Sequence, residues 1–105
     1  MKISNAFSLN MLSNLTAKIN SNELLLEEVK NILLSDGVDS AVGHPDTAKV
    51  FSSVLGIEIP MNRATVQLHS GDTILVGQYI GPRLPEGATE LPQGSTIKWA
   101  IVDIE

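Results

Sequence analysis

The sequence predicts an α/β domain in which a mixed β-sheet is covered by a few short helices. Two segments carry apolar residues at helical spacing, and several others alternate or run apolar as strands do. Helices and strands are interleaved along the chain, which favours a sheet with helices packed on it. With 105 residues, of which 43% are hydrophobic, the chain has the size and composition of a single domain over residues 1–105.

The first half of the chain predicts a strand, a helical turn and a helix. Residues 2–7 have the pattern of a short strand, and Ser8 is placed to cap a helical turn at 9–12. A helix is expected after Ser21-Asn22, ending at Asp36-Gly37. The apolar residues that share one face of this helix are Leu25, Val29, Ile32 and Leu33.

The second half predicts another helix between strands. Residues 39–43 form a short strand of small residues, and a helix begins at Pro45, because proline is tolerated in a first turn. Its apolar stripe consists of Ala48, Phe51, Val54 and Leu55, and Gly56 ends it. Beyond Pro60 the period changes to two: residues 64–80 predict a hairpin turning at Ser70-Gly71-Asp72, and 95–104 a final strand.

Residues 81–94 (GPRLPEGATELPQG) interrupt this pattern. They hold three of the five prolines and three of the eight glycines, which argues against a regular helix or a central strand. Long loops in small domains serve as lids or binding loops, although a solvated connector explains the composition equally well. The single arginine of this segment, Arg83, makes the loop a candidate for binding an anion.

Composition and charge exclude several classes of function. No cysteine is present, so disulfides and thiolate chemistry are excluded. A net charge of −5 argues against binding long nucleic acid, which depends on neutralising phosphates with Lys and Arg. The first 15 residues lack the apolar run of a signal peptide, and no later segment reaches the length of a membrane span. We therefore expect a cytoplasmic protein that contacts no membrane.

His44 is the residue most suited to acid–base chemistry, because imidazole exchanges protons near neutral pH. It follows Gly43, which lets a ligand approach the backbone, and precedes a helix whose N-terminus attracts anions. A histidine here could equally be a helix cap or a packed residue. His69, beside the predicted turn, is expected to be an exposed residue at a strand end.

No cluster with metal-ligand spacing, phosphate-binding glycine loop or serine-hydrolase motif is found, so no metal or cofactor is expected. A histidine, an arginine and a loop suit metal-free cleavage of an RNA phosphodiester. There the substrate's own 2′-hydroxyl is the nucleophile. The enzyme must protonate the leaving 5′-oxygen and stabilise the charged phosphorus centre.

Four segments occur in the same order as in one known family: SNAFSLNML at 4–12, AVGHPDT at 41–47, MNRATVQL at 61–68 and PRLPEG at 82–87. Together they resemble the small viral anti-CRISPR ring nucleases, and we expect a member of the phage and bacterial branch. This family degrades cyclic tetra-adenylate, the messenger of type III CRISPR defence, without a metal. The products are linear adenylates that end in a 2′,3′-cyclic phosphate.

The resemblance also implies roles for individual residues. His44 corresponds to the general acid, Arg83 to the group that stabilises phosphate charge, and Glu86 to the partner of that arginine. The resemblance implies that Arg83 and Glu86 lie on a long Gly/Pro-rich lid loop that closes over the ligand. The substrate-binding positions that match the family motifs are Asn5, Ser8 and Arg63, to which the residue analysis adds Gly43.

The implied assembly is a homodimer that holds cyclic tetra-adenylate across its two-fold axis. A ring of repeated phosphates matches a surface presented twice, and one small domain offers little concave surface. Two other functions stay open: a binding protein that sequesters the ring without cleaving it, and a protein that blocks another protein directly. The second of these predicts an exposed apolar patch and no polar pocket.

Overall fold

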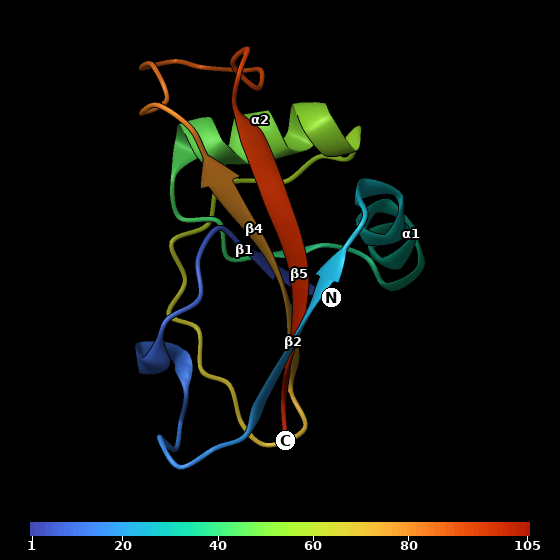
Figure 1. The fold of residues 1–105 in the computed structure, drawn as a ribbon, viewed down its shortest axis with the longest axis vertical. Coiled ribbons are helices and arrows are strands. Elements are labelled where there is room, and N and C mark those ends of the chain that lie inside the picture. The colour runs from blue at the N-terminus through green and yellow to red at the C-terminus, as the bar shows by residue number, and fades with distance from the viewer.

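The computed structural model describes all residues, 1–105. The chain contains five strands, two α-helices and one 3-10 turn, joined by loops (Figure 1). The strands are β1 (Lys2–Ser4), β2 (Ile19–Leu24), β3 (Asp39–Ser40), β4 (Thr73–Ile80) and β5 (Thr96–Ile104). The helical elements are the 3-10 turn η1 (Leu9–Met11) and the helices α1 (Leu26–Asp36) and α2 (Pro45–Leu55).

The five strands form one mixed sheet in the order β2-β5-β4-β1-β3, which confirms the predicted fold class. β1 runs parallel to both β3 and β4, whereas β5 is antiparallel to β4 and β2. The carboxyl ends of β1, β3 and β4 therefore lie at the same edge of the sheet. That edge positions the candidate site.

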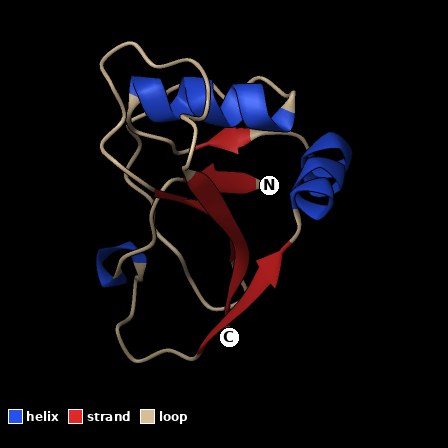
Figure 2. Cartoon of the chain, turned by 45° about the horizontal axis from the view of Figure 1, so that its top comes forward, coloured by secondary structure: helices blue, strands red, loops and turns tan.

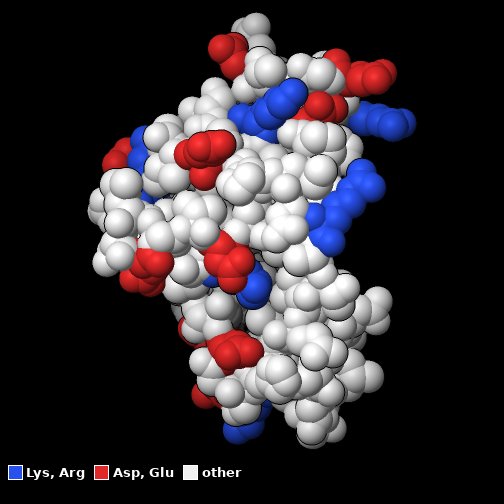
Figure 3. All heavy atoms as spheres, turned by 180° about the vertical axis from the view of Figure 1, so that it is seen from behind, with Lys and Arg blue, Asp and Glu red and all other residues white.

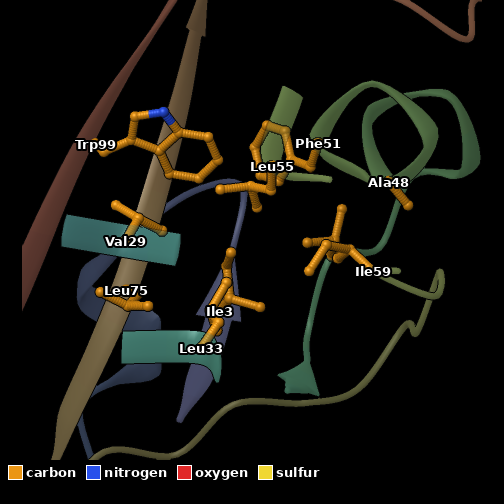
Figure 4. Close-up of a cluster of buried hydrophobic side chains, with 10 residues drawn as sticks. Ile3, Val29, Leu33, Ala48, Phe51, Leu55, Ile59, Leu75 and Trp99 are labelled. Atoms are coloured by element: carbon orange, nitrogen blue, oxygen red, sulfur yellow. The ribbon is translucent and has the colours of Figure 1, made fainter. Parts of the chain in front are cut away.

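Helices α1 and α2 cover one face of the sheet (Figures 1 and 2). The main core lies between them and the strands, and Figure 4 shows its side chains converging from both layers. Its ten buried residues are Ile3, Val29, Leu33, Val42, Ala48, Phe51, Leu55, Ile59, Leu75 and Trp99. Burial of these side chains is the principal term that stabilises the domain.

Gly77 in β4 allows α2 to pack closely on the sheet. The rings of Phe51 and Trp99 meet over it, with centroids 4.9 Å apart and planes inclined by 56°. A Cβ atom at Gly77 would lie 2.5 Å from Trp99 Cζ3 and 2.7 Å from Phe51 Cζ, distances that real side chains do not adopt. The missing side chain thus sets how near the helix comes to the strand.

The opposite face is covered by two irregular segments, residues 5–18 and 60–72, instead of helices. They close a second cluster that consists of Leu12, Ala41, Val66, Leu68, Ile74, Val76, Val102 and Ile104. Backbone hydrogen bonds tie the two segments together: the amide of Ser13 donates to the carbonyl of Leu68 over 2.9 Å, and the amide of Leu68 donates to Met11 over 2.6 Å.

The predicted ends of α2 are confirmed. Pro45 is the first residue of the helix, and Gly56 ends it in the left-handed region with φ 66°. α1 ends at Asp36 as predicted, but it begins at Leu26 instead of directly after Ser21-Asn22. The carboxylate Oε1 of Glu28 accepts a 2.9 Å hydrogen bond from the amide of Leu25, which satisfies a donor at the start of the helix.

The sequence prediction missed β2, because the strand INSNEL is polar and exposed over most of its length. Its six residues pair with β5 from Ile19–Ile104 to Leu24–Trp99, so the backbone ladder holds it in place. Two other strands are shorter than expected: β1 covers Lys2–Ser4 of the predicted 2–7, and β3 covers Asp39–Ser40 of the predicted 39–43.

The hairpin predicted over 64–80 is wrong. The turn at Ser70-Gly71-Asp72 exists, but residues 64–72 form no strand, and β4 pairs with β5. Val66 and Leu68 alternate with polar residues because they are buried in the second cluster while the chain crosses the outside of the sheet. His69 is exposed as expected, but it lies at this turn and not at the end of a strand.

Residues 81–95 join β4 to β5 and contain no helix or strand. In Figure 1 this loop projects at the top of the molecule, beyond the end of the sheet and next to α2. No helix in the protein is both long and apolar enough to span a bilayer.

Candidate functional site

The candidate site lies where the parallel strands end. Asn5 directly follows β1, residues 41–44 follow β3 and lead into α2, and Gly81 directly follows β4. In open α/β sheets, ligands bind in the crevice outside the carboxyl ends of parallel strands. The fold therefore brings three of the segments singled out in the sequence to a common edge.

His44 is the N-cap residue of α2, but its imidazole does not act as a cap. The backbone is extended (φ −127°, ψ 126°), and the side chain forms no capping hydrogen bond. Only its carbonyl oxygen joins the helix, by accepting a 3.0 Å hydrogen bond from the amide of Ala48. The exposed imidazole is thus free to bind a ligand or to transfer a proton.

Two adjoining hollows open beside His44, and both share His44, Arg83 and Leu84. The first has a volume of about 480 Å³ and is lined by His44, Asp46, Arg83, Leu84, Pro85 and Glu86. The second has a volume of about 300 Å³ and is lined by Asn5, His44, Thr47, Tyr79, Gly81, Arg83 and Leu84. Four of the residues predicted for the site, Asn5, His44, Arg83 and Glu86, therefore line this double hollow.

Asn5 is held at the hollow by a turn in the chain. The hydroxyl of the buried Ser4 donates to the carbonyl of Ala6 over 3.0 Å and accepts from the amide of Ala6 over 3.3 Å. These bonds fix the backbone on both sides of Asn5 as the chain leaves β1. The carboxamide of Asn5 forms no hydrogen bond within the chain, so its donors and acceptor are available to a ligand.

The other three predicted residues do not line the double hollow. Arg63 lies next to it, with its Nε donating a 3.0 Å hydrogen bond to the carbonyl of Gly43. A Cβ at Gly43 would face Arg63 Cγ at 3.5 Å, so the open side of Gly43 is turned toward Arg63. Ser8 precedes η1 and is exposed, with no capping bond from its hydroxyl.

Both signs of charge meet at the hollow. Arg83 and the protonatable His44 face the carboxylates of Asp46 and Glu86 across the same space. Arg83 forms no ion pair with either carboxylate within 4.0 Å: the three ion pairs of the protein are Lys2–Asp39, Lys30–Glu27 and His69–Asp72. The guanidinium of Arg83 is therefore free to bind an anion bidentately.

Beyond the site, acidic and basic side chains are interspersed over the upper part of the face in Figure 3, without a basic stripe. The lower right of that face carries no charged side chain, whereas several acidic side chains and a basic one lie along its lower left. Residues 5–17 and 64–71, which lie at this end of the molecule, contain no Lys, Arg, Asp or Glu. No three His, Asp or Glu side chains lie close enough together to hold a metal ion.

Two further residues that were not predicted from the sequence, Thr47 and Tyr79, line the second hollow. Thr47 is buried in the first turn of α2, and Tyr79 is the second-last residue of β4. Both line the second hollow, to which the first turn of α2 and the end of β4 contribute. The only signal in the sequence was proximity: Thr47 follows the GHPD segment, and Tyr79 immediately precedes the predicted loop.

Fold and site together define a small α/β domain with an open double hollow at the carboxyl edge of its parallel strands, the larger part of which is polar. The chain belongs to the STIV B116-like family, whose model matches residues 1–97.

Two relatives from archaeal viruses support this assignment. "Uncharacterized protein 26" of Sulfolobus islandicus filamentous virus (isolate Iceland/Hveragerdi) is 42% identical over 69 residues, 66% of this chain. That match spans 58% of the relative's own length. The structure of B116 of Sulfolobus turreted icosahedral virus is similar over 97% of both chains, with a TM-score of 0.81 and 29% identity. These matches support a viral origin, and both come from archaeal viruses instead of phages or bacteria.

Proposed function

We propose that this protein is a metal-independent ring nuclease that opens cyclic tetra-adenylate and thereby counters type III CRISPR signalling. One observation supports the proposal above others: His44 and Arg83, which are 39 positions apart in the sequence, line the same polar hollow beside the N-terminus of α2. A proton donor, an unpaired guanidinium and a helix N-terminus together suit a phosphodiester.

The proposed reaction needs no nucleophile from the protein. The 2′-hydroxyl oxygen of one adenylate attacks the adjacent phosphorus and forms the O2′–P bond, and its proton passes to water. The P–O5′ bond breaks, and His44 donates a proton to the leaving 5′-oxygen. The product therefore carries a 2′,3′-cyclic phosphate and a 5′-hydroxyl. Arg83 stabilises the negative charge that builds up on the phosphoryl oxygens in the transition state.

The size of the site favours a homodimer as the active form. A hollow of about 480 Å³ suits a drug-sized ligand, whereas a ring of four nucleotides is larger. Two copies related by a two-fold axis would present His44 and Arg83 twice to a ring with repeated phosphates. Cleavage at two opposite phosphates would then give linear di-adenylate. The protein would act in the cytoplasm of the infected host.

The proposal is tested by incubating the purified protein with cyclic tetra-adenylate in EDTA and identifying the products by chromatography and mass spectrometry. We expect linear di-adenylate with a 2′,3′-cyclic phosphate. The cyclic hexa-adenylate, run in parallel, measures ring-size preference. Size-exclusion chromatography with light scattering, with and without the tetramer, measures the oligomeric state.

The two histidines provide a matched pair of variants. Loss of a general acid typically slows a reaction about 10²–10⁴-fold, so His44→Ala should abolish most cleavage and retain binding. His69→Ala alters an exposed turn away from the hollow and should cleave like the wild type. Equal activity of His44→Ala and the wild type would remove His44 from the mechanism. Tight binding of an intact ring by the wild type would instead favour a sequestering protein.

A further inference from the structure

We propose that the hydroxyl group of Tyr79 fixes the loop backbone next to Arg83 and thereby positions the guanidinium at the hollow. This inference rests on the proposed function for its catalytic consequence, but its structural part stands alone. Tyr79 lies near the end of β4, half-buried, with its side chain facing the second lobe of the hollow beside His44.

The Tyr79 hydroxyl binds both stems of the loop 81–95. It donates a 2.7 Å hydrogen bond to the carbonyl oxygen of Pro82, on the stem that leaves β4. It also lies 2.9 Å from Oγ of Ser95, on the stem that enters β5. Because the Tyr79 hydroxyl proton is used in the bond to the Pro82 carbonyl, the Ser95 hydroxyl is the donor in the bond to the Tyr79 oxygen. One oxygen atom thus closes the neck of the loop.

These two are the only hydrogen bonds between residues 81–95 and the rest of the chain. The remaining bonds of the loop are internal turns, from the amide of Ala88 to Pro85 (3.0 Å) and from the amide of Ser95 to Pro92 (3.1 Å). Pro82 directly precedes Arg83. The contact with Tyr79 is therefore the last fixed point of the backbone before the guanidinium.

Gly81 makes the clamp sterically feasible. A Cβ at this position would lie 2.5 Å from Ser95 Oγ and 3.0 Å from the Tyr79 oxygen, so any other residue would push the two hydroxyls apart. The glycine also adopts φ 154°, at the edge of the region that disfavours other residues. Gly81, Tyr79 and Ser95 thus form one unit at the base of the loop.

Positioning matters here because Arg83 has no other support. It is exposed and forms no ion pair. An exposed arginine loses considerable side-chain entropy when it binds an anion, and a mobile backbone adds to that cost. A hydrogen bond that fixes the backbone next to Arg83 lowers the entropy that is lost when the guanidinium is ordered in the transition state. We expect this to raise the turnover number more than the affinity.

Limited trypsin digestion tests the clamp without reference to activity, because Arg83 is the only trypsin site in the loop. Tyr79→Phe removes the hydroxyl and keeps the ring. One net hydrogen bond corresponds to roughly a three- to tenfold shift in a local opening equilibrium, so cleavage after Arg83 should accelerate about three- to tenfold. Cleavage after the exposed Arg63 serves as the internal reference and should not change.

Ser52→Ala is the matched control. It also removes a half-buried hydroxyl, one that donates to Ala48 (2.8 Å) and accepts from the amide of Ile59 (2.8 Å) and forms no hydrogen bond with the loop. It should lower the melting temperature without selectively exposing Arg83. If Tyr79→Phe leaves cleavage after Arg83 at the wild-type rate, or accelerates both sites equally, the clamp is refuted.

Kinetics on cyclic tetra-adenylate test the catalytic consequence. We expect Tyr79→Phe to lower kcat by about three- to tenfold with a smaller change in KM, and Ser95→Ala to do so less strongly. The fall in kcat of the double variant should be smaller than the product of the two single effects, because both hydroxyls act through one contact. Faster trypsin cleavage with unchanged kcat would overturn the positioning role. An inactive wild type would overturn the proposed function, while the trypsin comparison would still decide whether the clamp exists.

Discussion

Arg63 is bonded to the residue that precedes His44: its Nε donates a 3.0 Å hydrogen bond to the carbonyl oxygen of Gly43. The methylene stem of Arg63 covers the open side of the glycine at the same time. This pair links the irregular segment after α2 to the strand–helix junction that carries the candidate acid.

A series of polar contacts holds that segment in register. The hydroxyl of Ser40 donates to the carbonyl of Pro60 over 2.6 Å. The amide of Asn62 donates to Val42 over 2.8 Å, and the carboxamide of Asn62 donates to the carbonyl of Ser40 over 2.8 Å. Residues 60–63 therefore run along residues 40–43, and Arg63 reaches Gly43 as the last contact of the series.

We predict that Arg63→Ala slows cleavage of cyclic tetra-adenylate more than it destabilises the fold. The bond of an exposed arginine to a carbonyl contributes about 1 kcal/mol, which corresponds to a fall in Tm of roughly 4–8 °C in a domain of this size. Cleavage should fall about tenfold or more, because the variant loses both a cation near the ring and a contact that fixes Gly43. Melting curves and steady-state kinetics measure the two effects.

Arg63→Lys separates charge from geometry in the same experiment. Lysine keeps the positive charge but lacks the planar Nε donor. If charge near the ring is what matters, Arg63→Lys should retain activity. If the contact with Gly43 matters, it should behave like Arg63→Ala. Wild-type kinetics for Arg63→Ala would show that Arg63 only supports the fold.

The two loop glutamates give a second matched pair. Glu86 lines the hollow beside Arg83, whereas Glu90 lies on the same loop outside it. Removal of a negative charge at about 4 Å in water is worth about 1 kcal/mol. We expect Glu86→Gln to bind cyclic tetra-adenylate roughly fivefold more tightly but to cleave it about tenfold more slowly, if Glu86 orients the arginine in the transition state.

Glu90→Gln should leave both values within experimental error. Affinity is measured for each glutamine variant combined with His44→Ala, so that cyclic tetra-adenylate is not cleaved during the measurement. Turnover is measured for each glutamine variant with His44 present. Identical behaviour of the two glutamine variants would exclude a role for Glu86.

A prediction on stability concerns the glycine under the aromatic pair. Gly77→Ala places a Cβ within 2.7 Å of the rings of Phe51 and Trp99, which must then separate. Overpacking of this kind costs about 1–3 kcal/mol. The shift also moves α2, and with it His44, relative to β4, so cleavage should fall together with Tm.

Gly43→Ala is the control for Gly77→Ala, because its Cβ would meet Arg63 Cγ at an ordinary 3.5 Å and no positive φ is required there. Chemical denaturation should show Gly43→Ala within about 0.5 kcal/mol of the wild type. Equal stability of Gly77→Ala and Gly43→Ala would contradict the close packing of α2 on β4.

The sequence by itself determined the elements whose signals are local. The apolar stripe of α2, its proline start and its glycine end are decided within a few residues, and the structure reproduces them. Residue chemistry singled out His44 and Arg83, and the resemblance to a family added Asn5 and Glu86. The fold brings all four to the double hollow.

Only the tertiary structure decided the pairing of strands. β2 is a polar edge strand that depends on backbone hydrogen bonds to β5, and no side-chain pattern reports such bonds. The alternation of Val66 and Leu68 imitates a strand because burial in the second cluster imposes the same period as a sheet face. The Tyr79 clamp is likewise tertiary, since it exists only where β4 and β5 bring residues 82 and 95 to the same hydroxyl. Local sequence fixes the conformation of a segment, whereas the partner of its hydrogen-bonding groups is chosen by the whole fold.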